Sequence, residues 1–470
     1  MDNWIKKQAL INPNRLAVDD GTTRYTFAEM APIVADLAGK VDSLTNNQRV
    51  AIETDNSLNG YLMALAVLAS GRTILWLNRR LAPEEIERQL TDAAVDLLLV
   101  ADEMADFKFS VMTYRFSQVQ SLPIEKPKMI AQFADDAVAS IMYTSGTTGA
   151  PKGVLQTFNN HFSSAVSSAL NLGLSSHDEW LCTVPIFHIS GFSIMMRGLI
   201  YGMAVRLVDH FDAATINQIL VKEPISMISV VPYMLKRLLT EQENTGTPYT
   251  ANFRGMLLGG GPIDRQALER CQRLDLSVVQ SYGMTETCSQ IIALNYADAA
   301  DELGSVGKPL FLTQLKLDSD GEVLLKTPAL TPGYLNRPEA LANKKVNGWY
   351  QTGDIGHLDA DGFLFIDGRK DDMIISGGEN VFPNEIENAY ADFPGLEAIA
   401  VVKKADPKWD QVPVAFYVAE EDLSEQALVA YGRKHLAHYK VPKAFYRIAK
   451  LPMNAGGKVQ RYRLINTLER

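Results

Sequence analysis

Strand-like and helix-like segments alternate along the chain from the N-terminus to about residue 303. Val50–Glu53 has the apolar pattern of a strand, Ser57–Ala69 that of a helix, and Thr73–Leu77 that of the next strand. The same order returns between Val205–Val208 and "SVVQSYG" at 277–283. Because parallel strands are joined by crossover helices, this alternation predicts an α/β fold with layered, largely parallel sheets.

The pattern changes after about Gly304, where hairpin-like pieces replace the alternation. "TQLKLDSDGEVLLKTP" contains the turn signal D-S-D-G, and "HLDADGFLFIDGRKDD" predicts a second hairpin. A smaller α+β unit of alternating helices and strands follows. We therefore place a boundary in the charged segment 369–372, between a large domain over 1–368 and a small domain over 373–470.

Length, charge and cysteine content limit the classes of function. A chain of 470 residues is too long for one ordinary core, so about two or three folding units are expected. The formal net charge of -10 argues against nucleic acid as the main partner, because phosphate backbones need a basic surface. The longest apolar run near the N-terminus, Tyr61–Ala69, is far too short to span a membrane. The first residues lack the apolar core of a signal peptide, and the three cysteines lack metal-ligand spacing, so we expect a cytoplasmic protein.

A loop rich in glycine and hydroxyl residues follows an apolar run in "IMYTSGTTGAPKGV" at 141–154. Free backbone N–H groups and hydroxyls suit phosphate oxygens, and Lys152 adds a positive charge. The P-loop pattern requires the lysine directly after a glycine, whereas Pro151 precedes it here. The sequence thus predicts a phosphate-binding loop that is not a P-loop, with an ordinary surface loop as the alternative.

Four further segments occur in a fixed order after this loop: "QSYGMTE" (280–286), "YQTGD" (350–354), "GRKDDMIISGGENVFPNEIE" (368–387) and "LPMNAGGKVQR" (451–461). Together with the loop, they resemble the motif set of the adenylate-forming enzymes, which include acyl-CoA synthetases, peptide-synthetase adenylation domains and luciferases. The resemblance runs through essentially the whole chain. It implies a large α/β domain with a small β-barrel-like part, a mobile C-terminal domain, and ATP-dependent activation of a carboxylate with Mg²⁺ and, usually, coenzyme A as co-substrate.

The resemblance also implies which residues bind ATP. Tyr282 would stack on adenine, Asp354 and Arg369 would bind the ribose, and "YQTGD" would place Asp354 just past a tight turn. Glycines beside adenine and the acyl group would leave room that side chains would fill. The remaining residues of this set are Thr144, Ser145, Gly146, Thr147, Thr148, Gly149 and Lys152 over the β- and γ-phosphates, and Gly259, Gly260 and Gly261 beside adenine.

Catalytic and metal-binding roles follow from the same resemblance. Glu286 matches the carboxylate that holds Mg²⁺, Thr285 an α-phosphate contact, and Lys458 the lysine between the substrate carboxylate and the α-phosphate. Asp371 matches the hinge about which the small domain rotates, and the glycines of "SGGEN" match the lining of the pantetheine tunnel. These are Gly377 and Gly378. Without the family, each would be interpreted as an ordinary turn or surface residue.

The acyl substrate is predicted from "PIFHISGFSIMMRGLIYGM" at 185–203. His188 stands where amino-acid adenylators have an aspartate for the substrate ammonium, so an amino acid is disfavoured, and the resemblance makes His188 a gate between the acyl and ATP sites. Arg197 lies among apolar residues of a predicted helix and needs a partner for its charge. We expect it to face the second carboxylate of an aromatic dicarboxylate, with Ser289 and Gln290 as further polar contacts. The alternatives are a core histidine for His188, and an internal salt bridge or an exposed position for Arg197.

Three other functions compete with this interpretation. The nearest is a CoA ligase for a simple aryl or fatty acid, and a second is a nucleotide-binding regulatory protein without chemistry. The presence of Glu286, Asp354 and Lys458 argues against the second. A peptide-synthetase module is disfavoured by His188. Whether the chain forms a homo-oligomer stays open at this stage.

Overall fold

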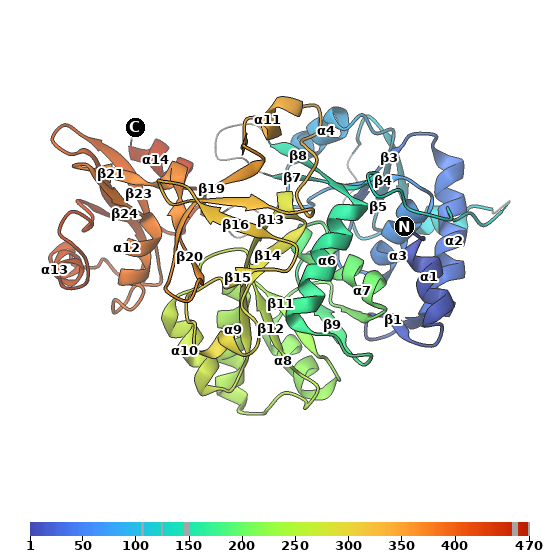
Figure 1. Ribbon diagram of the computed structural model, residues 1–470, viewed down its shortest axis with the longest axis horizontal. Helices are drawn as coiled ribbons and strands as arrows, with labels where there is room; N and C mark the ends of the chain where they lie inside the picture. The colour runs from blue at the N-terminus through green and yellow to red at the C-terminus, as the bar shows by residue number, and fades with distance from the viewer. Residues whose placement is uncertain (105–107, 124–125, 145–150, 454–458, 469–470) are drawn as a thin grey trace. The chain divides into compact units, whose positions relative to one another are not determined.

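The computed structural model describes residues 1–104, 108–123, 126–144, 151–453 and 459–468, and this part of the chain divides into two compact units (Figure 1). Unit 1 comprises 1–260, 267–314 and 326–348, and unit 2 comprises 261–266, 315–325 and 349–470. The change of sequence pattern near residue 304 therefore falls inside unit 1. The proposed hinge segment 369–372 lies within unit 2, and its role as a domain boundary stays a prediction.

The larger sheet of unit 1 is parallel through its centre and antiparallel at its ends. Strands β1, β10, β9, β11, β12 and β13 run parallel, whereas β2, β14 and β15 pair antiparallel with their neighbours. The order is β15 (Lys308–Pro309), β14 (Ser289–Ala293), β13 (Val278–Met284), β12 (Gly255–Leu258), β11 (Met227–Val230), β9 (Glu179–Cys182), β10 (Ala204–Leu207), β1 (Leu16–Asp19), β2 (Arg24–Thr26).

The second sheet of unit 1 ends in the hairpin that holds the glycine-rich loop. Its order is β6 (Met112–Arg115), β5 (Leu97–Val100), β3 (Arg49–Glu53), β4 (Thr73–Trp76), β7 (Val138–Thr144), β8 (Lys152–Thr157). Only β7 and β8 pair antiparallel in this sheet, among the strands that the structure describes. Apolar side chains of β3, β4, β5 and β7 pack with α4 in one core cluster, as expected for strands buried on both faces.

Helices join the strands of unit 1 as the alternation predicts. Helices α6 and α7 lie side by side and pack on one another (Figure 1). Ser57 caps α3 through a bond to the Gly60 amide, which explains why the helix begins there. The helices are α1 (Trp4–Ile11), α2 (Phe27–Leu44), α3 (Leu58–Ala69), α4 (Pro83–Asp92), α5 (Phe116–Ser121), α6 (Phe158–Leu172), α7 (Ile189–Tyr201), α8 (Ala213–Lys222), α9 (Pro232–Thr245), α10 (Arg265–Arg273) and α11 (Pro338–Ala342), with the short turns η1 (Thr285–Thr287) and η2 (Asp298–Ala300) and the short strand β18 (Lys345–Val346).

Unit 2 contains two strand systems, which are antiparallel except for the parallel pairing of β24 with β25. In the first, β16 (Gln314–Leu317), β17 (Glu322–Lys326), β19 (Trp349–Leu358) and β20 (Leu364–Arg369) are successive neighbours, followed by the turn η3 (Lys370–Asp372). In the second, the order is β22 (Glu379–Val381), β21 (Ile374–Ser376), β24 (Asp410–Val418), β23 (Ala398–Asp406), and β25 (Phe445–Arg447) pairs with β24. Its helices are α12 (Pro383–Tyr390), α13 (Glu425–His435) and α14 (Arg461–Leu468).

The predicted fold class is confirmed: the chain is a mixed α/β protein with layered sheets and a smaller C-terminal α+β part. One local prediction is wrong. Asp354 lies inside β19 rather than after a tight turn, because the strand continues through Gly353, whose φ is +77°. A register shift between Ile355 and Gly356 lets β19 and β20 keep pairing past this point. No described helix is long and apolar enough to cross a membrane.

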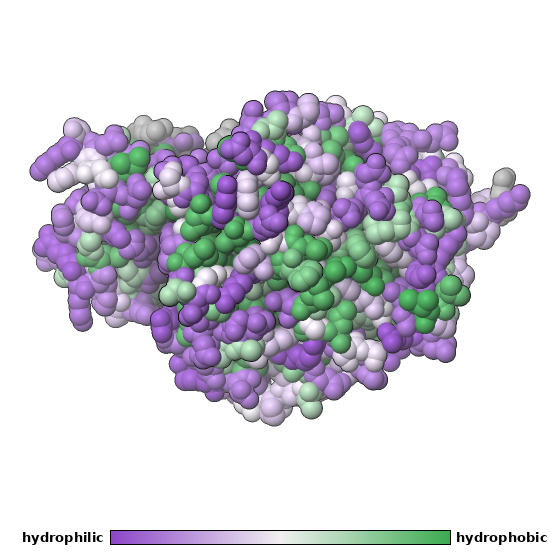
Figure 2. Space-filling view, in the orientation of Figure 1, coloured by the Kyte–Doolittle hydropathy of each residue, from purple (hydrophilic) through white to green (hydrophobic). Residues whose placement is uncertain are grey.

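Part of the surface of unit 1 is apolar. Phe162 and Leu170 of α6 are exposed, and Figure 2 shows apolar surface over this helix. Apolar atoms contribute about half of an ordinary protein surface, so this face does not by itself define a binding site.

Candidate active site

The two ends of the glycine-rich loop meet across the β7–β8 hairpin. Thr144 is the register partner of Lys152, so both lie at the mouth of the loop. The Lys152 ammonium lies 5.6 Å from the centroid of the Tyr334 ring, which places it on an aromatic face. The other predicted phosphate-binding residues, Ser145, Gly146, Thr147, Thr148 and Gly149, lie outside the described residues.

The β13–η1–β14 hairpin holds the predicted adenine, α-phosphate and magnesium residues. Tyr282 lies in β13, and Thr285 and Glu286 lie in η1. A register shift follows Tyr282, and a Cβ on Gly283 would overlap the carbonyl oxygen of Ser289. The two strands can approach this closely only because residue 283 has no side chain.

Glu286 is held by two contacts from the segment after β17. The Tyr334 hydroxyl donates to Oε1 of Glu286 at 2.8 Å, and the Thr331 amide donates to the Glu286 carbonyl at 2.7 Å. Within the described residues, no group of three or more His, Cys, Asp or Glu side chains could hold a metal by itself. A single carboxylate fits Mg²⁺ that arrives with a nucleotide, because that ion takes few protein ligands and keeps phosphate oxygens and waters.

A buried chain of polar side chains supports the carbonyl of Thr285. The His161 ring contacts Ser140 Oγ at 3.1 Å, Ser140 donates to Gln156 at 2.6 Å, and Gln156 donates to the Thr285 carbonyl at 2.9 Å. Burial, aided by the charge of Arg197, lowers the pKa of His161 to about 3. The imidazole is therefore neutral at physiological pH, and the chain fixes η1 against β8 and α6.

Arg197 is a buried cation whose described contacts include no carboxylate. It is 1% exposed on α7, and its Nη2 donates to Gln290 Oε1 at 2.7 Å. Its guanidinium carbon lies 5.3 Å from the centroid of the Trp180 ring, and its Nε has no hydrogen-bond partner among the described groups. Burial lowers its pKa, while Tyr201 opposes this shift. The alternative of an internal salt bridge is thus not formed with the described residues, and the charge is held by neutral groups.

Gln290 supports Arg197 rather than standing free in the site. Its amide nitrogen donates to Ser168 at 2.9 Å, and Ser289 donates to the same oxygen that Arg197 uses, also at 2.9 Å. These bonds fix the orientation of the amide. The predicted pair Ser289 and Gln290 therefore lies next to Arg197, as the sequence interpretation requires, but Gln290 is fully occupied in placing the guanidinium.

The remaining predicted residues of unit 1 lie at the ends of elements. His188 is the N-terminal cap position of α7, and its ring centroid lies 4.8 Å from that of Phe187. Gly259 and Gly260 directly follow β12, where Ser281 donates to the Leu258 carbonyl at 2.9 Å. Gly261 begins the segment 261–266, which belongs to unit 2.

In unit 2, the predicted ribose-binding residues form an ion pair across β19 and β20. Arg369 Nε lies 2.8 Å from Asp354 Oδ1. The buried Glu322 supports both strands, because its carboxylate accepts from the Gly353 amide at 3.0 Å and from Lys370 at 2.9 Å. Glu322 thus binds the residue before Asp354 and the residue after Arg369, and these contacts fix the ion pair.

The last predicted residues lie around η3 and the C-terminal sheet. The Asp371 carbonyl accepts from Lys403 at 2.8 Å. Gly377 and Gly378 form the turn between β21 and β22 with φ values of +63° and +88°, which favour glycine. Lys458 lies outside the described residues.

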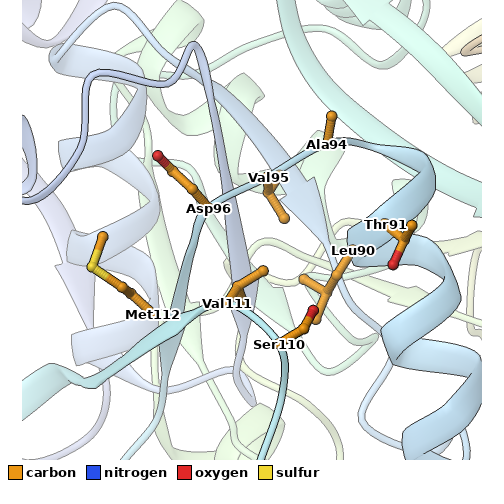
Figure 3. Close-up of a pocket in the computed structure, with 8 residues that line it drawn as sticks. All are labelled: Leu90, Thr91, Ala94, Val95, Asp96, Ser110, Val111 and Met112. Atoms are coloured by element: carbon orange, nitrogen blue, oxygen red, sulfur yellow. The ribbon is translucent and has the colours of Figure 1, made fainter.

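A shallow cavity of about 440 Å³ lies elsewhere in unit 1, between the end of α4 and the start of β6 (Figure 3). Its acidic residue, Asp96, already accepts from Thr45 at 2.6 Å. None of the residues predicted for ATP or substrate lines it; the lining is Leu90, Thr91, Ala94, Val95, Asp96, Ser110, Val111 and Met112. We therefore do not assign the chemistry to this cavity.

Comparison with known protein families identifies this arrangement. A family model described as "AMP-binding enzyme" matches residues 5–335, and "AMP-binding enzyme C-terminal domain" matches 385–458. The chain belongs to the AMP-binding enzyme family. The predicted resemblance to adenylate-forming enzymes is thus confirmed, and both matches together cover most of this AMP-binding enzyme.

Relatives that match this chain over nearly its full length share the same name. The chain is 46% identical over 466 residues to 2-succinylbenzoate–CoA ligase of Listeria monocytogenes (strain F2365), with 99% of each chain covered. It is 41% identical to the protein of the same name from Geobacillus sp. (strain WCH70), with 98% of this chain and 96% of the relative covered.

Solved structures of proteins with an equivalent name are also similar to this chain. O-succinylbenzoate coenzyme A synthetase of Bacillus subtilis in complex with OSB-AMP has a TM-score of 0.94 and 37% identity, with 99% and 98% of the two chains covered. The same Bacillus enzyme with ATP and magnesium ion has a TM-score of 0.93, 37% identity and 99% coverage of both chains. The names of these relatives agree with a resemblance in the sequence. The chain resembles o-succinylbenzoate–CoA ligases of menaquinone synthesis in four features: "PIFHISG", Arg197, "YGMTETCSQ" and "NWIKKQALINPNRLAV".

Sequence reasoning missed three side chains that the structure places in the site: Tyr334, Gln156 and Trp180. Each contacts a predicted residue that is distant in the sequence. A signal existed only for Gln156, a buried amide directly after Val154 and Leu155 in β8, because buried polar groups require partners.

Proposed function

We propose that this AMP-binding enzyme is an ATP-dependent 2-succinylbenzoate–CoA ligase. In the first step, a carboxylate oxygen of the acid attacks the α-phosphorus of ATP and pyrophosphate leaves. In the second, the sulfur of coenzyme A attacks the acyl carbon, the thiol loses its proton and AMP leaves. Full-length similarity to ligases of this name supports the proposal.

The proposed roles of the described residues in unit 1 are mainly positioning and charge stabilisation. Lys152 contacts the terminal phosphates, Thr285 the α-phosphate, and Tyr282 the adenine. Magnesium bound to the triphosphate neutralises part of its negative charge, and Glu286 is the carboxylate that we assign to hold it. His188 separates the acyl group from the nucleotide.

Arg197 is the observation that carries the choice of substrate. A guanidinium buried at 1% exposure costs free energy unless an anion compensates it. Gln290 and Trp180 supply only neutral contacts. The second carboxylate of 2-succinylbenzoate, which is not activated, supplies the missing charge.

For unit 2 we propose that Asp354 and Arg369 bind the ribose, that Lys458 contacts the reacting carboxylate, and that Gly377 and Gly378 line the pantetheine path. Asp371 is proposed as the hinge. We place the enzyme in the cytoplasm, which the free state of the chain's cysteines supports.

A product assay tests the proposal. The purified protein is given magnesium, ATP, coenzyme A and one acid at a time: 2-succinylbenzoate, benzoate or hexanoate. Thioester and AMP are quantified by liquid chromatography and mass spectrometry. We expect the highest kcat/KM with 2-succinylbenzoate, and equal or better turnover of the simple acids would contradict the proposal.

Replacing Arg197 by methionine tests the substrate site itself. Loss of a charged hydrogen bond is worth about 1.5–3 kcal/mol, so KM for 2-succinylbenzoate should rise about 10- to 100-fold while KM for ATP stays unchanged. Because the variant removes a buried charge, its melting temperature should be equal or higher. Addition of 2-succinylbenzoate should raise the melting temperature of the wild type but not of Arg197→Met. An unchanged KM removes Arg197 from the substrate site.

A simpler acid is the second candidate. A fatty acyl CoA synthetase of Mycobacterium tuberculosis has a TM-score of 0.77 and 29% identity, with 99% and 98% of the chains covered. If this chain activated such an acid, hexanoate would be turned over and Arg197→Met would leave its KM unchanged.

A further inference from the structure

One segment after β17 fastens two of the proposed ATP-binding elements to one another. The Thr331 amide donates to the Glu286 carbonyl at 2.7 Å, and the Leu335 amide donates to the Gly153 carbonyl at 2.7 Å. The first contact holds η1 and the second holds the start of β8. The residues between them are therefore fixed relative to both elements.

Tyr334 lies in the middle of this segment and is 4% exposed. Its hydroxyl donates to Glu286 Oε1 at 2.8 Å, while its ring lies under the Lys152 ammonium at 5.6 Å from the centroid. One side chain thus contacts both the proposed magnesium-holding acid and the proposed phosphate-binding lysine. Tyr334 thus contacts the negative charge of Glu286 through its hydroxyl and the positive charge of Lys152 through its ring.

We propose that Tyr334 is a positioning residue for the triphosphate end of the nucleotide. The inference rests on the proposed function, because it takes Glu286 and Lys152 as the groups that receive magnesium and phosphates. The hydroxyl fixes one carboxylate oxygen of Glu286 and leaves the other oxygen to face the cation. The aromatic face holds the Lys152 ammonium at the point where β8 begins.

Two substitutions separate the hydroxyl from the ring. Tyr334→Phe keeps the aromatic face and removes the donor, so the Kd for ATP in excess magnesium should rise at least about 10-fold. Tyr334→Leu also removes the face, which should weaken the same binding by about two- to fivefold more. Both Kd values are measured by calorimetry without acid or coenzyme A, so turnover is not the readout.

AMP in the presence of EDTA serves as the ligand that needs neither group. It lacks the β- and γ-phosphates, so its Kd should be unchanged in Tyr334→Phe. Tyr249→Phe is the matched control, because the Tyr249 hydroxyl is buried and has no hydrogen-bond partner among the described groups. That variant should bind both ligands as the wild type does.

A double substitution tests whether the hydroxyl acts through Glu286. In a Glu286→Gln background, Tyr334→Phe should add no further loss of magnesium–ATP affinity, since the carboxylate that the hydroxyl positions for the cation is already absent. Additive losses would overturn the positioning role. Unchanged magnesium–ATP binding in Tyr334→Phe, or an equal loss of AMP binding, would also overturn it.

Failure of this inference is distinguishable from failure of the proposed function. If the wild type binds magnesium–ATP but forms no thioester from 2-succinylbenzoate, the substrate assignment fails and the Tyr334 measurements still stand. If thioester forms at the expected rate and Tyr334→Phe binds magnesium–ATP normally, only the role of Tyr334 is wrong.

Discussion

Single charged residues in unit 1 differ in how their charge is compensated. Arg206 lies 2.8 Å from Glu223, and Arg72 lies 2.8 Å from Asp42. Arg197, more deeply buried than either, has neutral contacts within the described structure. Arg206 and Arg72 are thus paired internally, whereas Arg197 has no such pair within the described structure, as expected if its proposed partner is the substrate carboxylate. Sequence alone could not separate these cases, because the ion-pair partners of Arg206 and Arg72 are distant in the sequence.

Glu179 of β9 makes the stability of unit 1 depend on pH. Burial, with Asp19 and Glu223 nearby, raises its pKa to about 7, although Arg206 and Arg24 oppose the shift. The folded protein therefore keeps a proton that the unfolded chain releases above its ordinary pKa of 4.5. Stability from this group is fully present below pH 4.5 and is lost as pH rises toward 7.

Glu179→Gln should remove this dependence, because glutamine carries no charge at any pH. Relative to wild type, its free energy of unfolding should gain roughly 2 kcal/mol between pH 5 and pH 8, as measured by urea denaturation. A difference that stays constant across this range would show that Glu179 does not titrate in the folded state.

Among the residues that the structure describes, the β13–η1–β14 hairpin contains most of the predicted nucleotide-binding side chains of unit 1. It contains Tyr282, Thr285, Glu286 and Gln290, and it closes over Gly283. The geometry of the nucleotide contacts therefore depends on the spacing of two strands at one glycine.

Gly283→Ala should push β13 and β14 apart, because the added Cβ meets the Ser289 carbonyl. We expect a loss of about 1–3 kcal/mol in stability together with weaker AMP binding. Gly333→Ala is the control, since a Cβ there meets nothing within 4 Å. Equal melting temperatures and equal AMP affinities for the two variants would contradict the strand-spacing argument.

The sequence predicts elements better than contacts. The strand over Val50–Glu53, the helix after Ser57 and the helix bearing Arg197 all occur where the periodicity places them. The antiparallel β7–β8 pairing was not predicted, because a local pattern does not specify the partner strand. Tyr334 was missed for a related reason: its contacts with Glu286 and Lys152 exist only after the chain has folded.

At the level of the whole molecule, the chain's two compact units share the proposed chemistry between them. Glu286, Lys152 and Arg197 belong to unit 1, and Asp354 and Lys458 belong to unit 2. Under the proposed assignment, residues of both units take part in one reaction, and we expect a substitution in unit 2 to affect one half-reaction selectively.

Lys458→Ala should abolish adenylate formation and largely spare thioester formation from preformed acyl-AMP. Loss of a charged group that stabilises the transition state costs about 10²- to 10³-fold in rate. Pyrophosphate release measures the first half-reaction, and thioester formation from synthetic acyl-AMP measures the second. Lys450→Ala, which removes an exposed lysine of the same unit, should leave both rates unchanged. Equal loss of both half-reactions would contradict the role.

All three cysteines of the chain are buried, and burial raises the pKa of Cys182 to about 12. A thiolate is the form that attacks acyl groups, so these sulfur atoms cannot intercept a reactive mixed anhydride. An enzyme that prepares such an anhydride for an incoming mercaptan thereby avoids acylation of its own thiols. The same burial lets a chromogenic thiol reagent follow consumption of the mercaptan with little background from the protein.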